Sequence, residues 1–221
     1  MSYLINNPGD VITLLLQHLR MTSIALAIAI ALSVPLALLV TRLRWLTIPV
    51  LGSLGVLYTI PSLALIIFLV PLFGLNATSV IVAMVLYTQV ILVRNLTVGL
   101  AGINPAVLEA ARGMGMSVAQ RWWRVQVPLV LPVFLAGVRI AAIVAIAIAT
   151  IGAKFNAGGL GKLLFDGIQT NRYDKIVAGS IAVAGLALVI NGLLLALEHY
   201  AQPQRRLKQK PQSLPGLGLR Q

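Results

Sequence analysis

The sequence contains no cysteine among its 221 residues, and it has few acidic side chains and few histidines. Without cysteine there can be no disulfide framework, no thiolate metal site and no thiol nucleophile. Asp and Glu together number five, and neither His18 nor His199 belongs to a metal-binding motif of the HExxH type. This inventory argues against a hydrolytic enzyme, because hydrolysis needs acid–base groups or a metal beside the substrate.

Charged residues of both signs are scarce, at 10% of the chain, while 59% of the residues are hydrophobic. A soluble domain has about 25% charged residues. The 17 Lys and Arg residues give a net charge of +12, which in a soluble protein would suggest nucleic acid as a partner. In so apolar a chain, cationic loops beside membrane spans explain the charge, and no nucleic-acid partner is expected.

Long apolar runs are what the sequence has in abundance. A helix needs about 20 apolar residues to cross a hydrocarbon core about 30 Å thick. Five runs of that kind predict an all-α polytopic membrane protein, with spans at about 22–40, 48–70, 79–100, 127–151 and 176–197.

The predicted organisation has three parts. Residues 1–20 form an N-terminal interfacial segment with a short helix at 11–19, residues 21–200 form the transmembrane domain, and residues 201–221 form a basic, disordered tail. Ten of the 17 Lys and Arg residues fall on the side of the 101–126 loop and the tail, and five on the other side. The richer side is predicted to be cytoplasmic, which places the N-terminus outside and the C-terminus inside.

The loop at 101–128 carries several local structure signals. Asn-Pro at 104–105 is a typical N-cap and first-turn pair. Gly113 and Gly115 permit a turn with positive φ, and Ser117 with Gln120 fits a capping box. The pattern predicts two short helices joined by a glycine turn and held against the inner face of the membrane.

The same loop contains a spaced motif: EAA at 109–111, three intervening residues, Gly115, nine further residues, and VQVP at 125–128. It resembles the EAA loop of ABC-importer permeases, with Val at the motif's Ile and Leu positions. The segments GLAGINPAVLEAARGMGM (99–116), TIPSLAL (59–65) and AGGLG (157–161) resemble the osmoprotectant branch of that family, which handles glycine betaine, choline and carnitine.

The resemblance implies a mechanical role for the loop, which would transmit the closure of a cytoplasmic ABC ATPase dimer to the spans. Glu109 would be the polar contact, and Ala110 and Ala111 the close-packing surface. Gly115 would make the turn, and Pro128 would fix the re-entry into the membrane.

The resemblance also implies a set of partners. These are an ATPase that holds ATP and Mg, an extracytoplasmic substrate-binding protein, a second permease in a homodimer or heterodimer, and membrane lipid. The location implied is the bacterial inner membrane. This chain has no GxxxxGK[ST] phosphate loop, so no cofactor is expected in it, and the glycines at 158–161 predict a tight external turn.

Polar residues within the spans are candidates for the translocation path, because polar groups in lipid are costly. The side chains that can hydrogen-bond could instead serve helix packing. Pro61 breaks a backbone hydrogen bond within its span, and this local break could line the path, let the helix flex, or be a static kink. Arg139 is expected to face a cavity or a partner subunit, in a structural or gating pair. The candidates are Tyr58, Pro61, Ser62, Tyr87, Gln89, Arg139 and Asn191.

Three functions remain open from the sequence. The favoured one is the permease subunit of an ATP-driven importer for an osmoprotectant delivered by a binding protein, and not itself an enzyme. A permease for an amino acid or methionine is the alternative within transport. A membrane assembly or interaction protein without transport activity is the alternative from another class.

Overall fold

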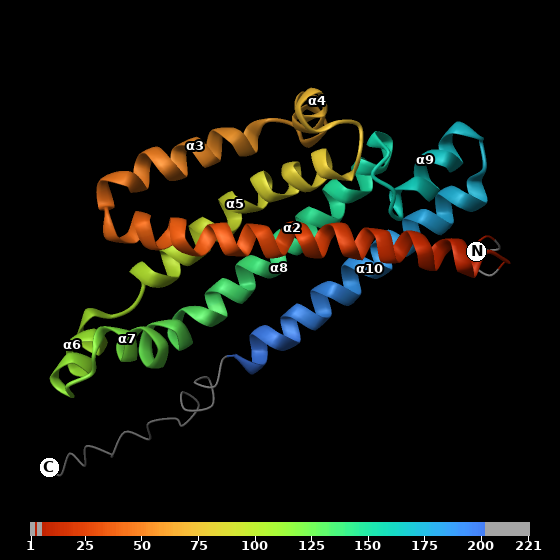
Figure 1. The fold of residues 1–221 in the computed structure, drawn as a ribbon. Helices are drawn as coiled ribbons and strands as arrows, with labels where there is room; N and C mark the ends of the chain where they lie inside the picture. The colour runs from red at the N-terminus through yellow and green to blue at the C-terminus, as the bar shows by residue number, and fades with distance from the viewer. Residues whose placement is uncertain (1–2, 4–5, 202–221) are drawn as a thin grey trace, which may run out of the picture.

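The structure is a computed structural model that describes residue 3 and residues 6–201, and all regular structure within these residues is helical (Figure 1). Four helices are long and apolar enough to cross a membrane, and a fifth span is possible if a sharply bent pair counts as one. The all-α polytopic class predicted from the sequence is therefore confirmed.

The first long helix, α2 (Pro8–Arg42), has 35 residues. It begins after Asn7 with Pro8 in its first turn, where the missing proline N–H costs nothing. Residues 11–19 were expected to form a separate interfacial helix, but they are continuous with this one, because no helix-breaking residue separates them from the apolar run.

The second expected span is broken rather than straight. After a short turn, η1 (Arg44–Leu46), helices α3 (Thr47–Thr59) and α4 (Ser62–Phe73) meet at an angle of 98°. Ile60 and Pro61 both have extended backbones, with ψ of 128° and 133°. Proline disfavours a helical conformation in the residue before it and cannot donate a hydrogen bond itself. The sequence predicts one span over 48–70 with a local break or kink at Pro61; the structure confirms the break and shows that it is a turn of 98° between two separate helices.

Helices α2, α5 (Ala77–Ala101) and α8 (Val127–Gly152) form the core of the bundle (Figure 1). Their contact faces are rich in small side chains, which let helix backbones approach closely. The alanines with no exposed surface in these three helices are Ala25, Ala29, Ala37, Ala83, Ala141, Ala145 and Ala149.

The remaining helices occupy the two ends and one side. At one end lie α6 (Pro105–Gly113), α7 (Val118–Arg121) and the π-helical turn η2 (Trp122–Gln126); at the other lie η3 (Ala153–Phe155) and α9 (Gly161–Gln169) (Figure 1). Helix α10 (Tyr173–Tyr200) packs on α8 and α9 and has few buried residues. Below, the two ends are called the loop end (α6–η2) and the α9 end.

Candidate functional site: the loop end and the span interior

Helix α6 begins as the sequence predicts. The Asn104 side-chain oxygen accepts a hydrogen bond from the Ala106 amide at 3.0 Å, and Pro105 occupies the first helical position. Both features stabilise the start of a short helix that would otherwise fray.

Helix α6 ends in a Schellman motif centred on Gly115. The Met116 amide donates to the Ala111 carbonyl at 3.2 Å, and the Gly115 amide donates to the Arg112 carbonyl at 2.9 Å. The φ of Gly115 is +76°, a conformation that suits glycine. Gly113 was expected to share this role, but it is helical, because the chain reverses two residues later.

The second half of the loop is a continuous helix that runs into the membrane. Ser117 and Gln120 form the predicted capping box, with hydrogen bonds of 3.3 and 2.8 Å. Pro128 lies in the first turn of α8 and has no N–H for the Arg124 carbonyl. The helix widens there into η2, where the Val127 amide bonds to the Trp122 carbonyl five residues back.

The outer surface of α6 and the turn mixes one carboxylate with apolar side chains. Glu109 and Ala110 are exposed, whereas Ala111 is buried beneath the Schellman turn. Met114 and Val118 are 69% and 68% exposed beside them. Apolar side chains clustered on an exposed surface are typical of a protein contact.

Five of the candidates for the path lie near the α3–α4 bend. The rings of Tyr58 and Tyr87 are 5.3 Å apart between centroids and tilted by 53°. Pro61 and Ser62 form the bend itself. Gln89 is buried and donates from Nε2 to the Ala29 carbonyl at 3.0 Å, which ties α5 to α2.

The other two candidates join α8 to α10. Arg139 donates from Nε to the Glu198 carboxylate at 3.2 Å, and from Nη1 to the Asn191 side-chain oxygen at 3.4 Å. Arg139 thus has an ion-pair partner within the same chain, as the predicted structural pair requires. Sequence reasoning missed Glu198 as this partner; the available signal was that only five carboxylates exist to neutralise a cation within a span.

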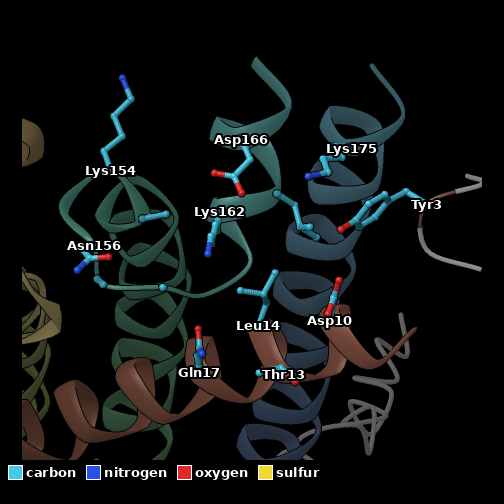
Figure 2. A pocket seen from close by; sticks show the side chains of 14 residues that line it. Tyr3, Asp10, Thr13, Leu14, Gln17, Lys154, Asn156, Lys162, Asp166 and Lys175 are labelled. Atoms are coloured by element: carbon cyan, nitrogen blue, oxygen red, sulfur yellow. The ribbon is translucent and has the colours of Figure 1, made fainter. Parts of the chain in front are cut away.

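A cavity of about 800 Å³ opens at the α9 end, between the start of α2, α9 and the start of α10 (Figure 2). Asp10, Asp166, Lys154, Lys162 and Lys175 are among the residues that line it (Figure 2). The predicted glycine turn forms one wall: Gly158 and Gly159 have φ of +78° and +81°. The Gly159 amide donates to the Gln17 side chain at 3.1 Å.

The sequence has close relatives among characterised permeases. It is 37% identical to the osmoprotectant import permease protein OsmW of Salmonella typhimurium, over 91% of this chain and 96% of the relative. It is 37% identical to the carnitine transport permease protein OpuCB of Listeria monocytogenes, over 85% and 86%. It is 32% identical to the choline transport system permease protein OpuBB of Bacillus subtilis, over 94% and 96%.

Solved structures share the fold at lower identity. The MetNI methionine ABC transporter in an inward-facing conformation matches with a TM-score of 0.76 and 20% identity, over 87% of this chain and 96% of that one. An amino acid ABC transporter with histidines matches with a TM-score of 0.72 and 17% identity, over 89% and 96%.

Most of the chain also matches one protein family. Residues 29–207 match the family described as the binding-protein-dependent transport system inner membrane component. This range includes the EAA loop, the α3–α4 bend and the Arg139–Glu198 pair. The chain belongs to that family and is a permease subunit of an ABC importer.

Proposed function

We propose that this permease takes up an osmoprotectant of the quaternary ammonium class, such as glycine betaine, choline or carnitine. The observation that carries the proposal is the 32–37% identity, over most of the chain, to permeases named for osmoprotectant, carnitine and choline transport. The amino acid and methionine transporters share the fold at 17–20% identity, which supports no transfer of substrate.

The loop end is the proposed contact for a cytoplasmic ATPase dimer, which binds ATP and Mg. Helix α6 is closed at its start by Asn104 and at its end by Gly115, so its nine residues move as one body. Glu109 and Ala110 lie on its exposed surface. A short rigid element can pass a rigid-body motion to the spans, as alternating access requires. Ala111 and Pro128 contribute from inside the loop, by closing the turn and by setting where the helix enters the membrane.

The α9 end is proposed to face outward and to meet the substrate-binding protein. The distribution of Lys and Arg supports this orientation, with the N-terminus outside and the C-terminus cytoplasmic. Residues 202–221 of the proposed cytoplasmic tail lie outside the described residues.

The interior polar residues are proposed to line or shape the path. Tyr58 is 41% exposed and presents an aromatic face next to Tyr87, which would give a trimethylammonium group a weak cation–π contact. Pro61, Ser62 and Gln89 set the geometry around the bend. Arg139 and Asn191 hold α10 on α8 and are proposed to fix the wall of the path.

A second permease, identical or similar, is proposed to complete the path. Helix α10 leaves a broad apolar surface exposed, in which Leu188 is 71% and Leu193 63% exposed. Co-purification of two differently tagged copies of this chain distinguishes a homodimer from a heterodimer.

The proposal is tested by reconstituting the permease with its ATPase and binding protein in vesicles. We expect ATP-dependent uptake of labelled glycine betaine, choline or carnitine, and none of methionine or histidine. In Glu109→Lys, uptake should fall at least tenfold while membrane insertion is unchanged, because a cation replaces the contact carboxylate. Co-purification of the ATPase should also fall in Glu109→Lys, and it should stay at the parent level in the control Asp10→Lys, the same charge reversal at the opposite end. Normal coupled uptake in Glu109→Lys would contradict the coupling role, and uptake of methionine alone would contradict the substrate class.

A further inference from the structure

Two adjoining cavities lie between the loop end and the spans. One, of about 420 Å³, is enclosed by α2, α5, the start of α8 and η2. The other, of about 690 Å³, lies beside it toward α6 and α7. The two share four lining residues, Leu38, Leu100, Trp122 and Trp123, so they adjoin, and together we call them the loop-end cavity.

The membrane-side part of the loop-end cavity is apolar. Its walls include Val34, Leu96 and Val130 from three different helices, and Phe134 lies at its membrane side. The only polar group on any of its lining side chains is the indole N–H of the two tryptophans. Water finds at most the two indole donors in such a space, fewer than the two to four partners that a buried water needs, whereas a hydrocarbon chain fits it.

The loop-side part of the loop-end cavity is cationic. Arg42, at the end of α2, and Arg121, at the end of α7, both line it, and no carboxylate is among its lining residues. Arg121 uses Nη1 to donate to the Met116 carbonyl at 3.1 Å, which holds the side chain in place and leaves other guanidinium donors free. Guanidinium groups bind phosphate oxygens through paired hydrogen bonds.

This division matches the two halves of a phospholipid. Tryptophan prefers the level of the headgroups, and Trp122 and Trp123 lie where the apolar and cationic parts meet. We infer that the loop-end cavity binds an anionic phospholipid, with its phosphate at Arg42 and Arg121 and an acyl chain between α2, α5 and α8. A quaternary ammonium substrate does not suit this site, because two guanidinium groups without a carboxylate repel a cation.

The α9-end cavity shows why the assignment is specific to the loop end. Asp10 and Asp166 line that cavity together with lysines, so the charges are mixed, and polar groups such as Gln17 replace the apolar wall (Figure 2). Neither an acyl chain nor an anionic headgroup is favoured there.

The inference requires only that the chain spans a membrane, and it does not depend on the transported substrate. The chain has three tryptophans, so Trp45→Phe with Trp123→Phe leaves Trp122 as the one indole, inside the loop-end cavity. This full-length variant is reconstituted in phosphatidylcholine vesicles that contain increasing fractions of a lipid with brominated acyl chains, which quench indole fluorescence on contact.

We expect brominated phosphatidylglycerol to reach half-maximal quenching at a mole fraction about fivefold lower than brominated phosphatidylcholine. Arg42→Gln with Arg121→Gln should bring the two lipids to equal quenching. Arg112→Gln, an exposed arginine of the same loop that does not line the cavity, is the matched control and should keep the fivefold preference.

Equal quenching by the two lipids in the variant that retains only Trp122 would overturn the inference. This comparison uses both arginines intact, so it does not depend on whether the arginine variants fold. Loss of the preference in Arg112→Gln as well would also overturn it, because general attraction to the basic loop would then be the cause. Leu38→Phe, which adds bulk to the shared wall, should reduce quenching by both lipids; unchanged quenching would place the bound chain outside the cavity.

Discussion

The two ends of the bundle use glycine differently: the α9 end needs it for close packing, at its left-handed Gly158 and Gly159 as well, whereas the loop end needs it for backbone conformation alone. At the α9 end, a Cβ added to Gly167 would lie 2.7 Å from Ile176 Cγ1, and one added to Gly179 would lie 2.9 Å from Leu164 Cγ. One added to Gly161 would collide with the Thr150 carbonyl oxygen. At the loop end, a Cβ on Gly113 or Gly115 would meet nothing within 4 Å.

At one end glycine is needed so that helices can pack closely, and at the other it is needed for its backbone conformation. The α9 end is interlocked, because its glycines let α9 approach α8 and α10 closely. The loop end is a freely standing element whose shape comes from its own backbone hydrogen bonds and from one left-handed glycine. The α9 end therefore does not tolerate added bulk at its glycines, whereas the loop end does not tolerate a residue that disfavours positive φ.

The largest expected effect is at Gly161. In Gly161→Ala the new methyl group meets a backbone oxygen that cannot rotate away, so we expect a loss of about 3 kcal/mol in the free energy of unfolding, at the upper end for overpacking. Reversible unfolding in mixed detergent micelles measures it. The control is Gly185→Ala in α10, where a Cβ meets nothing within 4 Å and the helix gains stability. Equal losses in the two variants would refute the packing explanation.

A smaller effect is expected at Gly115. Alanine fits the space but not the φ of +76°, which costs an L residue about 1–2 kcal/mol. Because the loop packs little against the spans, Gly115→Ala should leave global unfolding unchanged and lower the uptake obtained per ATP hydrolysed. Gly113→Ala, two residues away and helical, should keep normal coupling. If both substitutions reduce coupling equally, the conformation of Gly115 is not the cause.

The smallest effect is expected at the capping box. Ser117→Ala removes the acceptor of the Gln120 amide, at a cost of about 1 kcal/mol that is local to α7. Hydrogen exchange at the Gln120 amide should become about fivefold faster, while Ser117→Thr, which keeps the hydroxyl, should exchange at the parent rate. Unchanged exchange in Ser117→Ala would show that the cap contributes nothing.

The sequence predicted the loop better than the interior. Asn104, Ser117 and the turn at Gly115 act through hydrogen bonds between residues two to five positions apart, so the local pattern contains the whole interaction. The bend at Pro61 was expected to interrupt hydrogen bonding within a span, but hydropathy records only how apolar a segment is and not its direction. A 98° turn and a mild kink therefore look the same in the sequence.

Contacts between residues far apart in the chain could not be predicted from the sequence, for a related reason. Arg139 and Glu198 are separated by 59 positions, and Gln17 and Gly159 by 142. Two residues on different helices can pair only if they lie at the same depth in the bundle. That depth depends on the tilt of each helix and on the length of the connecting loops, and hydrophobic periodicity predicts neither. The glycine turn at 157–161 was predicted as a turn, but its close fit against α2 follows only from the packed structure.

The length of α2 connects the two ends of the molecule. At 1.5 Å per residue its 35 residues measure about 52 Å. Near its start Gln17 borders one cavity, and near its finish Thr41 and Arg42 border the other. Helix α2 thus borders both cavities, and Pro35 within it is a position where the helix can bend. A movement of Gln17 along the helix axis also displaces Thr41, unless the helix bends at Pro35. Helix α2 alone can therefore couple the two ends of the bundle, without a series of side-chain rearrangements.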